Sequence, residues 1–164
     1  MLAGRLSADT VAALRRLLLA LVGVAALGLL AELVLLEHYE SAWQYAPLVL
    51  LGAVLVAVAV VARRPSLASV RFFQTVMALC VAAGLVGVFL HLKGNVEFEL
   101  EREPLLRGLA LLWEAARGAT PALAPGAMAQ LGLLGLVYTY RHPALRREPP
   151  AQSPGITIDP SERP

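Results

Sequence analysis

The chain has 164 residues, of which 58% are hydrophobic and only 16% are charged. Ordinary soluble domains carry about 25% charged residues, and here the charges fall between long apolar runs, which leaves little chain for a soluble domain with its own core. The single cysteine, Cys80, excludes an internal disulfide and a thiolate metal cluster. Because it lies within an apolar run, we interpret it as a small packing residue.

Four apolar runs are long enough to cross a bilayer, which takes roughly 20 helical residues. They cover residues 17–36, 45–62, 72–92 and 121–140. The sequence therefore predicts an all-α integral membrane protein, with a four-transmembrane-helix bundle over residues 1–144. Residues 145–164 are rich in proline and polar side chains, so we expect a disordered tail there.

Local signals place the ends of the first and last spans. Ser7 is a plausible N-cap for a first helix that starts before the bilayer. A cleaved signal peptide is the rival interpretation of the first span, but the run is long for a signal core and no Ala-x-Ala site follows it closely. In the fourth span Thr120 is the expected N-cap with Pro121 in the first turn, and Pro125 predicts a kink or a loosened turn.

The distribution of basic residues predicts the orientation. The two termini and the connection between the second and third spans hold ten of the fourteen Lys and Arg residues. An excess of Lys and Arg marks the cytoplasmic side, so both termini are expected in the cytoplasm, in a plasma membrane of the bacterial inner-membrane type. The outer loops are then acidic, with Glu37, Glu40, Glu97, Glu99, Glu101, Glu103 and Glu114.

The outer loop of residues 93–120 contains two patterned segments. Residues 105–117 carry apolar side chains at helical spacing and predict a short amphipathic helix in the outer interface, with Trp113 at headgroup depth. Residues 95–101 alternate apolar side chains with glutamates, which predicts an extended segment. Its carboxylates would form either a rim that attracts cations or simply a solvated face.

Polar residues inside the apolar runs mark a candidate site. Glu32 shares a helical face with the small residues Ala25 and Gly28, which allow another helix to approach closely, so we expect Glu32 to point into the bundle. On the third span His91 continues a stripe of small residues. That stripe consists of Cys80, Gly84 and Gly87, and it indicates a helix-packing face. Further candidates for the outward-facing pocket are Tyr39, Asn95 and Glu97. On the fourth span Gly126 and Gln130 share a face that we expect to turn toward the interior, with Gln130 near the middle of the membrane.

The predicted chemistry of this pocket has three alternatives. A carboxylate and an imidazole together suit a divalent metal ion, with Glu32 and His91 as ligands, and they equally suit a proton relay. Alternatively, the two side chains bond each other or nearby backbone and only fix the register of the helices.

His38 raises the further possibility of a haem held by His38 and His91, since both histidines lie at outer helix ends. His38 follows Glu32 by six residues, roughly 120° around a helix. Unless the helix unwinds there, Glu32 and His38 cannot point into one pocket.

No catalytic signature is present: there is no Gly-x-Ser-x-Gly, His-Glu-x-x-His or Cys-x-x-Cys motif, and no phosphate-binding glycine loop. We therefore expect a non-catalytic accessory or scaffold subunit that associates with the bilayer and with other membrane subunits or further copies of itself. A cation- or proton-binding carrier and a haem-dependent redox protein are the alternatives. Nucleic-acid binding is not expected, because the arginines sit beside helix ends where orientation already accounts for them.

Overall fold

The computed structural model describes residues 2–118, 120–121 and 123–146, with side chains from Asp9 onward. Over these residues the chain is helical and contains no strand, which confirms the predicted all-α class. The expected tail lies outside the described residues except for Leu145 and Arg146. The elements are α1 (Leu2–Leu35), η1 (Ala42–Gln44), α2 (Tyr45–Arg63), α3 (Leu67–Arg102), α4 (Gly108–Ala116), α5 (Gly126–Thr139) and η2 (Pro143–Leu145).

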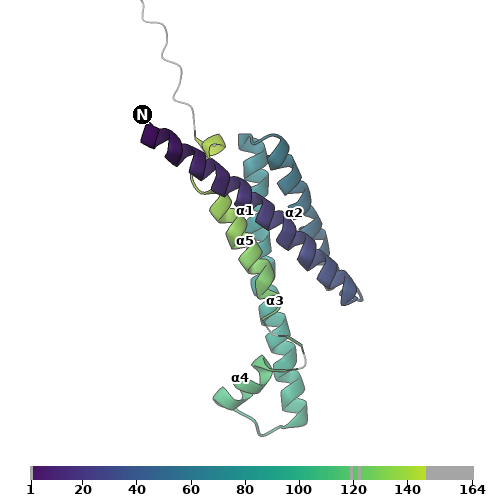
Figure 1. Cartoon of the computed structure of the whole chain (residues 1–164). Helices are drawn as coiled ribbons and strands as arrows, with labels where there is room; N and C mark the ends of the chain where they lie inside the picture. The colour runs from purple at the N-terminus through teal and green to yellow at the C-terminus, as the bar shows by residue number, and fades with distance from the viewer. Residues whose placement is uncertain (1, 119, 122, 147–164) are drawn as a thin grey trace, which may run out of the picture.

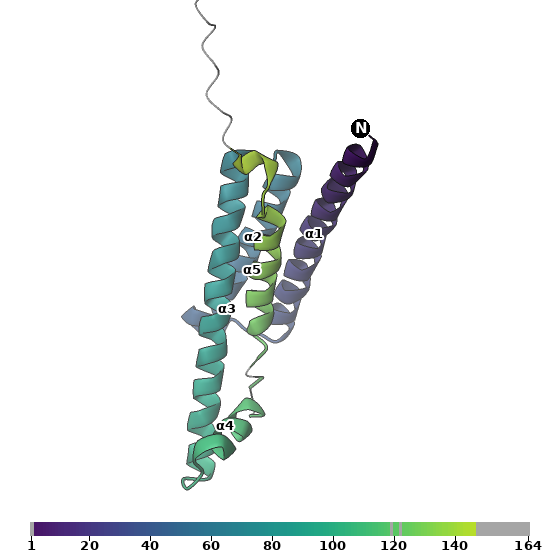
Figure 2. The same cartoon turned by 90° about the vertical axis from the view of Figure 1, so that its left-hand side faces the viewer.

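Four helices form an antiparallel bundle (Figures 1 and 2). Helix α1 packs against α2 and α5, and α3 packs against the same two helices, so α1 and α3 are diagonal neighbours. The core consists of aliphatic side chains with one aromatic pair, Phe73 and Tyr138, whose rings meet edge to face at 5.4 Å. Cys80 is fully buried in this core, as expected of a packing residue.

Three stretches are long and apolar enough to cross a membrane: Asp9–Leu35, Ala42–Arg63 and Leu67–Arg102. These agree with the first three predicted spans. Helix α5, with 14 residues, is a shorter apolar helix. The apolar helices therefore indicate a membrane-embedded helical bundle.

Two helix starts differ from the predicted ones. Helix α1 already begins at Leu2, so Ser7 lies inside the helix and is not its N-cap. Helix α3 begins earlier than expected, because Ser66 caps it: the Ser66 hydroxyl accepts a hydrogen bond from the Ser69 backbone N–H at 3.2 Å. The Ser69 hydroxyl in turn accepts from the Ser66 backbone N–H at 2.8 Å, which completes a capping box.

The prediction of an extended segment at residues 95–101 was wrong, because α3 continues without a break to Arg102. The residues beyond the apolar run have pairs at helical spacing, Lys93 with Glu97 at 3.5 Å and Glu99 with Arg102 at 3.2 Å. Asn95 and Glu99, one turn apart, are buried on the side where α4 packs. The packing of α4 against residues four apart on α3 thus favours a helix here, although the sequence alternates apolar and acidic residues.

The predicted start of the fourth helix was also wrong. Helix α5 begins at Gly126 with Pro125 as its N-cap, and residues 123–125 form turns, so the loosened turn expected at Pro125 lies before the helix and not inside it. Proline disfavours helical geometry in the residue that precedes it, so Pro125 delays the helix. Thr120 is consequently not a helix N-cap.

Helices α3 and α5 approach each other closely, and glycines on both helices make this possible. A Cβ atom on Gly132 would lie 2.5 Å from the Met77 carbonyl oxygen and 2.8 Å from the Val81 backbone nitrogen. A Cβ atom on Gly84 would lie 2.5 Å from the Ala129 backbone nitrogen. The expected helix-packing role of Gly84 is therefore confirmed.

Substituting Gly132 by alanine should destabilise the bundle, because the new methyl group meets backbone atoms that cannot rotate away. We expect the free energy of unfolding to fall by about 1–3 kcal/mol. The matched control is Gly52→Ala in α2, where nothing lies within 4 Å of the added Cβ atom, and alanine there should be neutral or stabilise by about 0.5–1 kcal/mol. Thermal unfolding of both variants in one detergent measures the difference, and equal stabilities would contradict the proposed close contact.

Candidate functional site

Glu32 does not point into the bundle, contrary to prediction. Its side chain is exposed and lines an open groove between α1 and α5, with a volume of about 430 Å³. The small residues beside it do not receive a neighbouring helix of this chain, since nothing lies within 4 Å of a Cβ atom built on Gly28. The face of α1 that packs inward instead carries Leu19, Val22 and Ala26.

Gln130 lines the same groove from α5 and is also exposed, so the expectation that it faces the interior was wrong. The inner face of α5 is taken by the residues that approach α3, among them Gly132 and Gly135. Gln130 lies on a different side of the helix from these glycines. The groove thus offers one carboxylate and one carboxamide to whatever surrounds the bundle.

His38 and His91 lie together at the acidic end of the bundle, with ring centroids 6.5 Å apart. The helix does unwind after α1: Glu37 adopts a left-handed conformation, with φ of 51°. The His38 backbone N–H bonds the Leu33 carbonyl at 2.9 Å and the Glu37 backbone N–H bonds the Val34 carbonyl at 3.1 Å, the pattern of a Schellman C-cap. This turn carries His38 across the bundle end toward α3.

The hydrogen bond of His91 identifies which of its ring nitrogens carries the proton. His91 Nδ1 lies 3.3 Å from the Pro121 carbonyl oxygen, which can only accept a hydrogen bond. Nδ1 therefore carries the proton, and in the neutral ring Nε2 keeps its lone pair. Among the described residues, no hydrogen bond or ion pair joins Glu32 to His91, and no group of three or more His, Cys, Asp or Glu side chains is placed to hold a metal ion.

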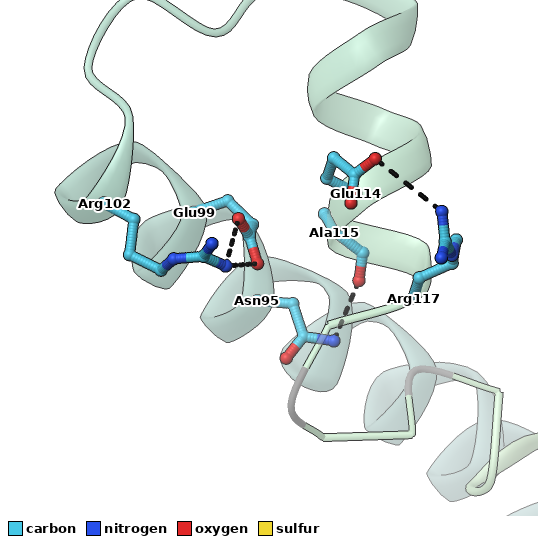
Figure 3. Close-up of polar contacts among 6 residues, drawn as sticks. All are labelled: Asn95, Glu99, Arg102, Glu114, Ala115 and Arg117. Carbon is cyan, nitrogen blue, oxygen red and sulfur yellow. Dashed lines mark hydrogen bonds and ion pairs between the residues drawn. The ribbon is translucent and has the colours of Figure 1, made fainter.

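Asn95 is a structural anchor. It is only 2% exposed, and its amide nitrogen donates to the Ala115 carbonyl at 2.9 Å (Figure 3) and to the Thr120 carbonyl at 2.7 Å. Its amide oxygen accepts from the Thr120 backbone N–H at 3.2 Å and from the Thr120 hydroxyl. These bonds tie the end of α4 and the following loop to α3, so Asn95 has no polar atom left for an outer pocket.

The remaining predicted pocket residues, Glu97 and Tyr39, do not lie together in one site. Glu97 is exposed and pairs with Lys93, and Tyr39 is 40% exposed in the turn after α1. Glu99, which the sequence reasoning did not single out, is 6% exposed and holds Arg102 (Figure 3). Because Glu99 follows Asn95 by four residues, the sequence could have indicated that both side chains lie on the same face of a helix.

A second polar cluster, which the sequence reasoning missed, lies at the basic end. Arg15 donates from Nη2 to the carbonyl oxygens of Tyr140 at 3.3 Å and Arg141 at 3.1 Å. His142 is buried, and its Nδ1 accepts a hydrogen bond from the Ala144 backbone N–H at 3.2 Å. The proton of the neutral ring is therefore on Nε2, which donates to the Tyr138 hydroxyl at 3.3 Å.

Burial, and secondarily the nearby positive charge of Arg15, lowers the pKa of His142 from its ordinary value of 6.5. Both causes favour the neutral ring that the hydrogen bond from Ala144 requires. Protonation of Nδ1 would break that bond and add a second positive charge beside Arg15.

The fold and these sites define an all-helical protein with membrane-length apolar helices and a distinct polar cluster at each end of the bundle. No protein-family model matches the chain, and neither a curated protein nor a solved structure matches it.

The neutral state of His142 predicts an acid-sensitive fold. Because the folded-state pKa is lowered, the unfolded chain takes up the proton first, so stability should fall as the pH decreases below about 6.5. His142→Asn keeps a side-chain acceptor for the Ala144 N–H but removes the titrating group. We expect a smaller drop in unfolding midpoint between pH 7.5 and 5 than in the wild type. An equal drop in both proteins would show that His142 does not carry this acid sensitivity.

Proposed function

We propose that the chain is a four-span membrane protein with both termini in the cytoplasm, and that it acts as an accessory subunit docking onto a larger membrane complex. The arginine-rich end, with the α2–α3 turn and both described chain ends (Figures 1 and 2), would face the cytoplasm. The docking role is supported by the segment that comprises the end of α3 and α4. We call this segment, residues 93–117, the arm.

The short α5 supports a fourth crossing when the turns before it are included. Its 14 residues span about 21 Å, less than the roughly 30 Å of hydrocarbon. Irregular backbone is tolerated at membrane depth where protein covers it. Here Pro125 lies against Gly87, and the Pro121 carbonyl is bonded by His91, so α3 covers part of this segment.

The arm presents apolar side chains that the chain itself does not cover. Leu105 is 89% exposed, Leu109 is 84% exposed and Trp113 is 62% exposed. Arg117 stacks over the Trp113 ring at 5.8 Å and lies 3.8 Å from Glu114 (Figure 3 shows the ion pair). An aromatic and aliphatic centre with a charged rim is typical of protein–protein interfaces.

The length of α3 beyond its apolar run indicates that a protein, and not lipid, covers the exposed apolar side chains of the arm. The helix runs from Lys93 to Arg102 beyond the apolar run, about 15 Å. The interfacial layer on each side of the hydrocarbon is only about 5–8 Å thick. With α3 along the membrane normal, the outer part of the arm stands clear of the headgroups. Its partner would be the extramembrane part of another membrane protein.

The docking role predicts a contact that depends on the arm. In membranes that contain the full chain, a photo-crosslinking residue at position 109 should capture one stoichiometric protein partner. Trp113→Ala should reduce that capture at least tenfold, since buried aromatic anchors typically contribute 2 kcal/mol or more. The matched control is a crosslinker at position 49 on α2, where Val49 is 71% exposed outside the arm, and it should not capture this partner. Crosslinks from position 109 to lipid alone, or capture that Trp113→Ala leaves intact, would overturn the proposal.

The proximity of His38 and His91 supports a second candidate function, which is the binding of a transition-metal ion or a haem iron at the acidic end of the bundle. The hydrogen bond from His91 Nδ1 to the Pro121 carbonyl leaves Nε2 available as a ligand and is the usual outer-shell arrangement of a metal-bound histidine. With metal–nitrogen bonds of about 2.0 Å, two imidazoles on opposite sides of one ion have centroids roughly 6 Å apart, close to the observed 6.5 Å.

Elemental analysis and a visible absorption spectrum of the purified chain test this candidate. A bound metal should be lost in both His38→Ala and His91→Ala but retained in Glu32→Gln, because Glu32 lies in the separate groove. A Soret band would identify haem, and metal without one would identify a bare ion. Loss of metal in the Glu32 variant, or a metal-free wild type after purification without chelator, would contradict the histidine site.

A further inference from the structure

An open cleft lies at the basic end of the bundle, between the first half of α1, the end of α2 and η2. Its volume is about 480 Å³. Its lining includes Ala12, Arg15, Arg16, Ala62, Pro65 and His142.

The charge of this cleft is positive. Arg15 and Arg16 both line it, and no described acidic side chain does. His142 contributes no charge in the state that the hydrogen bond from Ala144 requires. Arginine presents five N–H donors in a planar fork that matches phosphate oxygens, and the two bonds that hold Arg15 to backbone carbonyls both come from Nη2.

The walls below the arginines are aliphatic. Leu19 and Val61 line the cleft but are themselves buried, so the aliphatic surface that is exposed here belongs to Ala12 on α1, to Ala62 at the end of α2 and to Pro65. The cleft therefore presents two arginines at the level where the apolar spans begin, with exposed aliphatic residues beside them. A free phosphate ion would use only the first of these two features.

We propose that this cleft binds an anionic phospholipid, with the phosphate at Arg15 and Arg16 and the glycerol-ester region beside the exposed Ala62 and Pro65. Basic pockets between transmembrane helices are a known form of anionic headgroup site. The occupant would also fill the gap between α1 and α2 at this end of the bundle.

Native mass spectrometry of the full chain in mild detergent tests the site, with titrations of phosphatidylglycerol, phosphatidylcholine and inorganic phosphate. We expect phosphatidylglycerol to bind in preference to phosphatidylcholine. Arg16→Gln should weaken its binding about fivefold, the effect expected for one arginine near an anionic headgroup. Ala12→Trp should abolish binding, because Ala12 is an exposed residue that lines the cleft and the indole would fill it.

The matched control is Arg71→Gln, which removes an exposed arginine of α3 that does not line the cleft. It should leave the affinity unchanged, and thermal unfolding establishes that each variant is folded. If Ala12→Trp fails to fold, Arg16→Gln against Arg71→Gln still decides the question. Equal losses in these two arginine variants, or equal binding of the two lipids, would overturn the site. Displacement of the lipid by millimolar inorganic phosphate would show a simple anion site and overturn the lipid assignment.

Discussion

The close contact between α3 and α5 is the constraint on which the rest of the structure depends. At Gly84, Gly132 and Gly135 the opposing helix occupies the space where a side chain would be. Without a strong hydrophobic drive between helices in lipid, such backbone proximity is a main source of association. Among the described residues α1 contacts α5 but not α3. The position of α5 therefore also determines where α1 packs in the bundle.

Hydrogen bonds at the two ends of α3 complete this contact. Near the basic end, the Gln74 amide donates to the Thr139 hydroxyl at 3.1 Å. At the other end Asn95 holds the loop that leads into α5. The glycines between these points set the distance between the helices, and the polar bonds set their register. A single long helix thus positions both polar clusters and the arm relative to the apolar core.

The sequence predicted the helical class and the first three apolar helices, because length and composition determine these directly. It did not predict the continuation of α3 to Arg102 or the delayed start of α5, since the first depends on packing by α4 and the second on Pro125. It named His38 as a neighbour of His91 only in the haem alternative, and otherwise placed Glu32 beside His91. A left-handed Glu37 redirects the chain after α1, and nothing in a periodicity argument indicates where a helix will end in this way.

The small-residue stripes of α1 and α3 illustrate what a sequence pattern leaves open. Both look like helix-packing surfaces, yet only the stripe on α3 receives a neighbour within this chain. The one on α1, with Gly28 and Glu32, faces outward beside Gln130. A carboxylate about one turn from the end of an apolar helix is costly against lipid, and a partner helix would remove that cost. The outward stripe and the uncovered arm are separate surfaces, and both support the proposed association with other membrane subunits.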